Sequence, residues 1–203
     1  LRVVARQQQL VRCDFEAFPA EEVLKRHLGL FNELLSETNA LVLSDYGKGG
    51  LSHIADMIES ARAKNLPILV DPKGDDYSRY RGATVITPNR AELRQVVGSW
   101  SSEAALIERA QNLRRELNLS YLLLTRSEEG MTLFGPEGEL NVPAQAREVF
   151  DVSGAGDTVI AILAAMLATG MPIEDAVRIA NRAGGIVVGK LGTVAVSYEE
   201  LFA

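Results

Sequence analysis

The 203-residue sequence has one cysteine, two histidines, few aromatic residues, no long apolar run and no cluster of basic residues. A single cysteine, Cys13, cannot form an internal disulfide, and no signal-peptide pattern opens the sequence. The composition therefore predicts a protein of the reducing cytoplasm. His27 and His53 have no cysteine or second histidine at ligand spacing, so we expect no zinc site and place both at the surface. Cys13, in a strand-like run, is expected to pack as a small hydrophobe.

The charge balance is acidic, with 21 Lys and Arg against 27 Asp and Glu and a net charge of −6. Affinity for a phosphate backbone comes from concentrated Lys and Arg, so we predict no nucleic-acid partner. The most apolar stretch, 159–167, is far shorter than the ~20 residues of a membrane span. It predicts a buried helix and no membrane partner.

Several familiar phosphate-binding and catalytic motifs are missing from the sequence. There is no GxGxxG, no HRD or DFG set and no GxSxG. Residues 184–190 match GxxxxGK, but Leu191 stands where a P-loop needs Ser or Thr, and the segment ends a helical pattern. These absences argue against protein kinases, P-loop nucleotide hydrolases and α/β-hydrolases.

Short apolar runs alternate with helical patterns along the whole chain, without internal repeats or a flexible linker. This alternation is typical of a doubly wound α/β fold, a mostly parallel sheet with helices on both faces. Ser52 is a plausible N-cap for the first of these helices, and 197–200 has the spacing of a capping box. We predict strands at 40–44, 67–70, 83–87, 121–125 and 131–134, and helices at 52–64, 89–97, 102–117, 156–168 and 173–188.

Polar clusters follow four of the predicted strands. They are the segments 44–48, 71–73, 88–92 and 126–128. Ligands of such sheets bind beyond the carboxyl ends of the strands, so the four clusters favour a shared site. Separate turns, which also use Asp, Asn, Pro and Gly, are the alternative.

The segment 151–158 (DVSGAGDT) directly precedes the apolar helix. Small residues at 154–156 let backbone N–H groups approach a ligand, and a helix N-terminus favours an anion, so a phosphate would fit there. Asp157 would then lie beside the anion, where a carboxylate can accept a proton from an attacking hydroxyl. A plain helix cap is the alternative for Asp157.

The segment 151–157 resembles the D-[TS]-x-G-A-G-D signature of the PfkB/ribokinase carbohydrate kinases, and 89–92 (NRAE) resembles their N-x-x-E motif. The resemblance implies a ribokinase-like fold over the whole chain. The part of the family that precedes these motifs, with its glycine-rich signature and most sugar contacts, has no counterpart, so we expect an N-terminally truncated domain. Residues 1–16 would be lid or sugar-side strands, and 17–203 the nucleotide-binding core.

The resemblance also implies roles for the residues of the first motif. Asp157 would be the base that deprotonates the anomeric hydroxyl at C1 of a sugar. The amides of Gly154, Ala155 and Gly156 would form the anion hole for the transferred phosphate. Family members often bind a monovalent cation such as K⁺ beside this hole. Its ligands here would be Asp151, Ser153 and the loop around Gly192.

For the nucleotide, the resemblance implies ATP with Mg²⁺. Asn89 and Glu92 would hold Mg²⁺ and its water shell, which suits an ion that prefers oxygen ligands and keeps several waters. Lys73 would contact the γ-phosphate, with a solvated loop lysine as an equal alternative. The other nucleotide-binding residues would be Arg90 and Ala91 within the second motif, Thr125, Ser127 and Gly130 along the phosphates, and Asn181 near the adenine.

Within the family, segments such as 43–49 and 188–193 resemble the branch that phosphorylates D-glycero-β-D-manno-heptose 7-phosphate at C1, a step toward ADP-heptose and lipopolysaccharide core. This implies small-molecule partners and a homodimer. Arg2, Arg6 and Arg12 would meet the 7-phosphate, with a solvated strand face as the alternative. The absence of HxGH predicts a stand-alone kinase or an excised domain. A kinase for ribose, fructose 6-phosphate or 2-keto-3-deoxygluconate, or a non-catalytic nucleotide-binding module, remains open.

Overall fold

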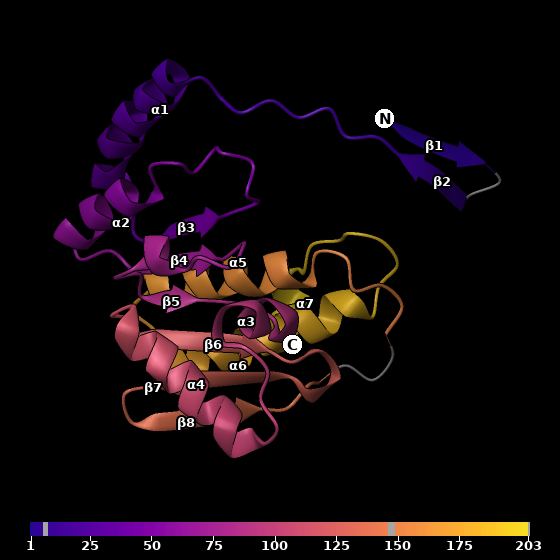
Figure 1. The fold of residues 1–203 in the computed structure, drawn as a ribbon. Helices are drawn as coiled ribbons and strands as arrows, with labels where there is room; N and C mark the ends of the chain where they lie inside the picture. The colour runs from indigo at the N-terminus through magenta and orange to yellow at the C-terminus, as the bar shows by residue number, and fades with distance from the viewer. Residues whose placement is uncertain (6–7, 146–148, 203) are drawn as a thin grey trace.

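Six strands form one sheet whose spatial order, β3-β4-β5-β6-β7-β8, is also the order along the chain (Figure 1). The computed structural model describes residues 1–5, 8–145 and 149–202. The first four strands pair in parallel and the last two continue antiparallel. The strands are β3 (Leu41–Ser44), β4 (Ile68–Asp71), β5 (Val85–Ile86), β6 (Tyr121–Thr125), β7 (Met131–Gly135) and β8 (Gly138–Val142).

Helices cover both faces of this sheet, as the sequence predicts. On one face α2, α3 and α4 contact β4, β6 and β7, and on the other α5 and α6 contact β3, β4, β7 and β8. The helices are α1 (Glu21–Leu34), α2 (Ile54–Ala63), α3 (Arg90–Val97), α4 (Glu103–Glu116), α5 (Ala155–Ala168), α6 (Ile173–Val188) and α7 (Tyr198–Phe202), and the 3-10 turns are η1 (Leu35–Glu37), η2 (Ser78–Tyr80) and η3 (Ser127–Glu129).

Alternate residues of the central strands supply two separate hydrophobic cores. Leu122 and Leu124 of β6 pack with α2, α3 and α4, whereas Leu123 packs with α5 and α6. All three side chains are fully buried. This double burial explains why the strand sequences are continuously apolar, because side chains of a strand alternate between faces and both faces here are covered.

Each predicted strand and helix is present, with ends within two residues of those predicted, but the helix α1 and the strand β8 were not predicted and one predicted cap is absent. Ser52 is not the N-cap of α2, because that position is held by His53 and the Ser52 hydroxyl donates to the Gly49 carbonyl at 2.6 Å. β8 was not predicted, since its sequence GELNV has few β-formers, and pairing with β7 makes it a strand. The capping box at 197–200 is present and precedes α7.

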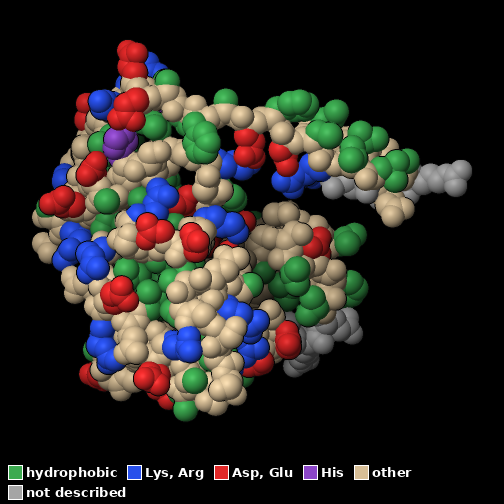
Figure 2. Space-filling model, viewed as in Figure 1, with side chains coloured by type: hydrophobic (Ala, Val, Ile, Leu, Met, Phe, Trp, Pro, Cys, Tyr) green, Lys and Arg blue, Asp and Glu red, His purple; other side chains and the backbone are tan. Residues whose placement is uncertain are grey.

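A separate hairpin of β1 (Arg2–Ala5) and β2 (Gln8–Arg12) stands at the end of an extended segment, away from the six-stranded sheet (Figure 1). Hydrophobic side chains gather along it in Figure 2, among them Val3, Val4 and Leu10, which are exposed. Arg6 lies outside the described residues. The interpretation of this hairpin as a lid, like the homodimer, stays a prediction.

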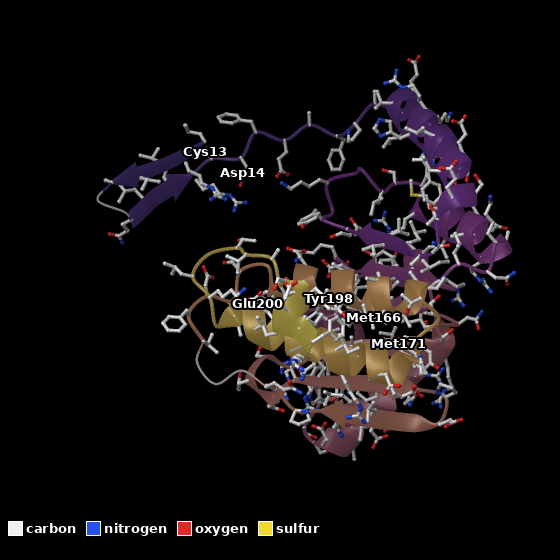
Figure 3. All side chains as sticks on the ribbon, turned by 180° about the vertical axis from the view of Figure 1, so that it is seen from behind. Cys13, Asp14, Met166, Met171, Tyr198 and Glu200 are labelled. Carbon is white, nitrogen blue, oxygen red and sulfur yellow. The ribbon has the colours of Figure 1, made fainter. Side chains whose placement is uncertain are left out.

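The packing prediction for Cys13 is wrong, because Cys13 is exposed. It follows the hairpin, and no helix lies over this segment (Figure 3). The two histidines differ in environment. His27 is exposed, whereas His53 is partly covered and lies near Glu21 and Asp56. Within the described part of the chain, no helix has both the length and the hydropathy needed to cross a membrane.

Candidate active site

A cavity of about 220 Å³ opens at the carboxyl ends of β4, β5 and β6, beside the first turn of α5. Three carboxyl groups and the glycines before and inside α5 contribute to it. Its lining residues are Asp71, Thr87, Asn89, Glu92, Thr125, Gly154, Gly156, Asp157 and Val159. The cavity joins two of the four predicted clusters, 71–73 and 88–92, to the end of β6 and to the glycine-rich segment, whereas the clusters 44–48 and 126–128 do not line it.

The start of α3 is fixed by a reciprocal capping box at the cavity edge. The Asn89 Oδ1 accepts from the amides of Ala91 and Glu92 at 2.9 and 3.0 Å, and the Glu92 Oε2 accepts from the Asn89 amide at 3.0 Å. Asn89 also bridges Thr125 in parallel-strand fashion. The two residues of the N-x-x-E motif thus hold the helix start and line the cavity with oxygen atoms.

Asp71 ends β4, and Lys73 follows it and pairs with Glu92 at this edge. The Lys73 Nζ lies 3.2 Å from the Glu92 Oε1. Burial, reinforced by the negative charges of Glu92 and Asp157, raises the pKa of Asp71 to about 6. The Ser44 hydroxyl, at the end of β3, lies 3.4 Å from the Asp71 Oδ2. The site therefore concentrates negative charge, which a bound cation would offset.

The glycine turn before α5 determines which backbone groups face the cavity. Gly154 is the N-cap of α5 and has a φ of +78°, a conformation that glycine adopts without penalty. A Cβ at Gly154 would also come within 3.0 Å of Thr193. The Ala155 amide donates to the Val152 carbonyl at 3.2 Å, whereas Gly154 and Gly156 line the cavity. Asp157 lies in the first turn of α5 and is exposed.

The residues predicted for a monovalent cation lie together beside this turn. The Asp151 Oδ1 accepts from the Ser153 amide at 2.9 Å. Hydrogen bonds from Ser153, and with less effect from the Gly192 backbone, lower the pKa of Asp151. The segments 151–153 and 192 are thus in contact.

The other predicted nucleotide residues lie outside the cavity, apart from Thr125. Ser127 begins η3 with a φ of +53° and Gly130 follows η3 with a φ of +91°, and Gly130 is packed so closely that a Cβ would collide with the Val142 carbonyl. Asn181 is buried in α6, and its Nδ2 donates to the Pro143 carbonyl at 2.8 Å. That side chain is engaged with the backbone near β8.

An ionic network that the sequence did not reveal supports the turn after β6. Arg90 makes two 2.6 Å bonds with the Glu129 carboxylate. Arg126, which is buried, bonds Glu129 at 2.7 Å and also Glu103. Arg90 and Glu129 are 39 residues apart, so no local spacing could have signalled their pairing. The network joins α3, α4 and η3 next to the predicted phosphate-binding segment.

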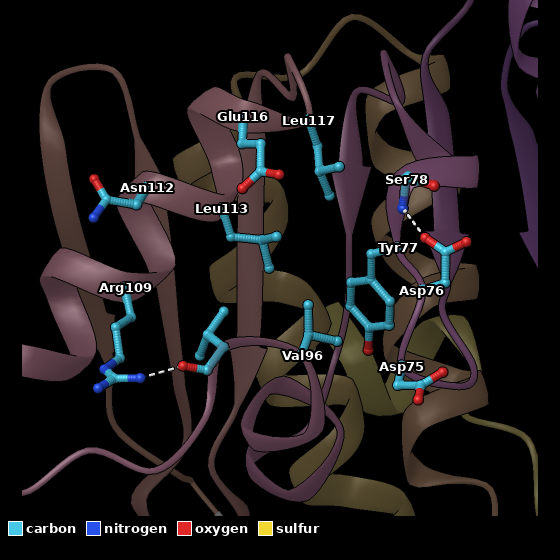
Figure 4. Close-up of a pocket in the computed structure, with 11 residues that line it drawn as sticks. Asp75, Asp76, Tyr77, Ser78, Val96, Arg109, Asn112, Leu113, Glu116 and Leu117 are labelled. Carbon is cyan, nitrogen blue, oxygen red and sulfur yellow. Dashed lines mark hydrogen bonds between the residues drawn. The ribbon is translucent and has the colours of Figure 1, made fainter.

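A larger cavity, of about 370 Å³, lies between α3, α4 and the segment before η2 (Figure 4). Its wall combines apolar side chains such as Val96 and Leu113 with Asp75, Asp76 and Glu116. Arg109 on this wall donates to the Val97 carbonyl. None of the predicted site residues lines this larger cavity.

A family model described as "pfkB family carbohydrate kinase" matches residues 14–200. The chain belongs to this family. Among curated relatives, this family member is 55% identical to the D-beta-D-heptose 7-phosphate kinase of Bordetella bronchiseptica, over 99% of this chain and 64% of the relative. It is 55% identical to the bifunctional protein HldE of Hahella chejuensis, over 99% of this chain and 42% of the relative. The chain thus spans less than two thirds of either relative.

Solved structures of the pfkB family share the fold at low sequence identity. Phosphofructokinase-2 from Escherichia coli, in complex with potassium, aligns with a TM-score of 0.78 and 19% identity, over 96% of this chain and 65% of that one. Ribokinase from Thermotoga maritima aligns with a TM-score of 0.73 and 22% identity, over 88% and 60%. The ribokinase-like fold expected from the two motifs is therefore confirmed.

Proposed function

We propose that this chain carries the nucleotide-binding and phosphoryl-transfer machinery of an ATP-dependent kinase that converts D-glycero-β-D-manno-heptose 7-phosphate to the 1,7-bisphosphate. One observation carries the proposal. The cavity at the strand ends combines the N-x-x-E residues, the acidic residue after β4 and the D-x-x-G-A-G-D turn of α5. The 55% identity to a relative named for heptose 7-phosphate supports this sugar over others in the family.

In this proposal Asp157 removes the proton from the C1 hydroxyl while that oxygen bonds to the γ-phosphorus of ATP, and the bond to the β-phosphate oxygen breaks. The oxygens of the transferring group accept from backbone amides at the start of α5. Gly154 and Gly156, which line the cavity, are the proposed donors, and the Ala155 amide would join them by exchanging the Val152 carbonyl for the phosphate. The helix N-terminus adds positive potential at the same place. An exposed position suits Asp157, because its proton acceptor atoms remain open to a substrate.

Mg²⁺ fits the chemistry of this cavity. The donor set is oxygen from Asp71, Asn89 and Glu92, and the pKa of Asp71 is raised by burial and then by the negative charges of Glu92 and Asp157. Across the described residues, no cluster of three or more His, Cys, Asp and Glu is suited to hold a metal alone. Asn89 and Glu92 would therefore hold the ion through water, and its charge would neutralise the ATP phosphates.

The remaining proposed contacts surround this centre. Lys73 would reach the γ-phosphate from the Glu92 side of the cavity, and Thr125, Ser127 and Gly130 would follow the nucleotide phosphates. Asp151, Ser153 and the Gly192 loop would hold a monovalent cation. We place the adenine towards α6, near Asn181, whose amide already anchors the Pro143 carbonyl.

The hairpin offers positive charge for the sugar 7-phosphate. Arg2 and Arg12 are cross-strand partners, so their side chains share one face of the hairpin. Like charges opposite one another repel, and a bound phosphate would relieve that repulsion. Asp14 already pairs with Arg12 at 2.8 Å. This pairing leaves Arg2 as the stronger phosphate contact of the two.

A panel of sugars tests the proposed function. Mg-ATP turnover is measured with heptose 7-phosphate, ribose, fructose 6-phosphate and 2-keto-3-deoxygluconate, and the product is located by phosphorus NMR. We expect turnover with heptose 7-phosphate and a new phosphate at C1. Turnover with another sugar alone would contradict the substrate, and Mg-ATP binding without any turnover would favour a non-catalytic module.

A further inference from the structure

One buried hydroxyl joins two loops at the edge of the sheet that carries the proposed site. Tyr80 lies in η2, and its hydroxyl accepts from the Lys73 amide at 3.1 Å. The same hydroxyl donates to the Asp45 Oδ2, 2.8 Å away, in the loop after β3. The Lys73 carbonyl is 3.0 Å from it. A single oxygen thus contacts the loop after β3 and both backbone groups of Lys73.

Both ends of this connection are rigid. The Tyr80 side chain is fully buried and packs edge-on against Tyr77, with ring centroids 5.4 Å apart. Asp45 is also buried, and its Oδ1 accepts from the Gly47 amide at 2.8 Å. A buried carboxylate without partners is costly, so the Tyr80 hydroxyl and Gly47 amide stabilise Asp45 where it is. Burial raises the pKa of Tyr80, which keeps the hydroxyl protonated and able to donate.

The connection continues from the Lys73 backbone into the cavity. The Lys73 side chain is exposed, with its Nζ 3.2 Å from the Glu92 Oε1, and Glu92 is held by the α3 capping box. Gly74, the next residue, has a φ of +85°, so the chain turns sharply straight after Lys73. An exposed lysine beside such a turn has many conformations available. The hydrogen bond from the Lys73 amide to the Tyr80 hydroxyl restricts the backbone at this lysine.

We propose that Tyr80 is a positioning residue, which through its bonds to Lys73 and Asp45 aims the Lys73 ammonium at the phosphoryl group transferred in the cavity. This rests on the proposed function. Tyr80 does not touch substrate, and it acts only through Lys73. The Lys73 ammonium acts as a point charge, so it neutralises a phosphate well only when it is held close to the phosphate oxygens. The bonds also couple the loop after β3 to the same lysine.

Tyr80→Phe tests the proposal, since it removes the hydroxyl and keeps the ring. The chain offers a matched control in Tyr77→Phe, because Tyr77 is an adjoining buried tyrosine whose hydroxyl has no hydrogen-bond partner among the described residues. We expect kcat to fall about tenfold in Tyr80→Phe, the effect of one lost hydrogen bond of about 1.4 kcal/mol. Tyr77→Phe should keep the wild-type kcat.

If the Tyr80 hydroxyl only stabilised the fold, its loss would lower the melting temperature without acting through Lys73. A double variant separates this case from the positioning role. Lys73→Met removes the ammonium. If Tyr80 acts through Lys73, adding Tyr80→Phe to Lys73→Met lowers kcat no further. Losses that multiply in the double variant would overturn the proposal. So would a kcat for Tyr80→Phe equal to that of Tyr77→Phe.

Amide hydrogen exchange gives a readout that does not depend on turnover. Loss of the Tyr80 hydroxyl should accelerate exchange of the Lys73 amide in Tyr80→Phe and not in Tyr77→Phe. Asp45→Asn, which removes the charged acceptor of that hydroxyl, should accelerate the same amide to a smaller extent. Unchanged exchange in Tyr80→Phe would overturn the proposal. If the variants show the expected exchange rates but the wild-type chain does not turn over ATP, the proposed function is contradicted and the hydrogen-bonded connection between Tyr80 and Lys73 still stands.

Discussion

At the residue scale, the buried carboxylate of Asp71 in the proposed site lowers the stability of the folded protein. Its pKa, raised to about 6 by burial and then by Glu92 and Asp157, exceeds the ordinary value of 3.8. Between about pH 4 and pH 6, Asp71 therefore binds a proton more readily in the folded chain than in the unfolded chain. Above pH 6 the carboxylate is charged in both states, and its burial destabilises the fold in full.

Asp71→Asn should raise the stability of the protein at pH 8. After allowance for solvent screening we expect a gain on the order of 1–2 kcal/mol. The gain should shrink as the pH falls through 6 and vanish near pH 4, because protonation then neutralises the wild-type side chain. Thermal unfolding of both proteins across this pH range measures it. A gain that grows towards low pH would contradict the assignment.

Gly130 is the residue whose backbone tolerates a side chain least. Its φ is +91°, and a Cβ would collide with the Val142 carbonyl and the backbone of Pro143 and Ala144. Gly130→Ala should therefore cost roughly 3 kcal/mol or more, against about 1 kcal/mol for positive φ alone. Gly170→Ala is the control, since Gly170 has a φ of +82° and open space around it. Equal melting temperatures for the two variants would refute the steric argument.

At this scale the sequence predicted contacts that follow from short spacing. Asn89 and Glu92 are three residues apart, so their capping box and their shared place at a strand end could be predicted from the motif. The partners of Tyr80 and Arg126 could not, because the hydroxyl of Tyr80 reaches Asp45 35 residues away and Arg126 reaches Glu103 23 residues away. Such pairs depend on how the strands are ordered in the sheet.

At the element scale, the two cores explain which predictions succeeded. Helix α5 has apolar residues on most of its surface and packs against both the sheet and the neighbouring helix α6, so an unbroken apolar run was sufficient to locate it. β8 has an alternating burial pattern and weak β-formers, and it exists because β7 offers it an antiparallel partner. Local propensity therefore sufficed for the apolar elements, the edge strand β3 included, and failed for β8 at the other edge of the sheet.

Leu163 should be among the most sensitive positions of α5. It is fully buried in the core between the sheet, α5 and α6. Leu163→Ala should cost about 3–4 kcal/mol through lost burial and an incompletely collapsed cavity. Leu30→Ala on α1, where the leucine is 54% exposed, should cost less than about 1 kcal/mol. Chemical denaturation compares them, and similar losses in both variants would contradict the packing described for α5.

At the scale of the whole molecule, an acidic chain of net charge −6 carries a site proposed for two anionic substrates. In the proposed site, positive potential for these substrates would come locally from helix amides at α5, Lys73 at the cavity and arginines on the hairpin. The family and the ribokinase-like fold could be predicted from two motifs in order along an alternating α/β pattern. The exposure of the hairpin and of Cys13 could not be predicted, because the sequence of a strand does not show whether another element packs against it.

Asp157 is the proposed proton acceptor, and one comparison of variants tests this role directly. The rate of Mg-ATP-dependent phosphate transfer to C1 of heptose 7-phosphate is measured for the wild type and for Asp157→Asn, with Mg-ATP affinity measured on the same samples. Asparagine cannot accept the proton, so kcat should fall by about 10²–10⁴-fold while Mg-ATP affinity stays within about threefold. An Asp157→Asn variant that transfers phosphate at the wild-type rate would contradict the account.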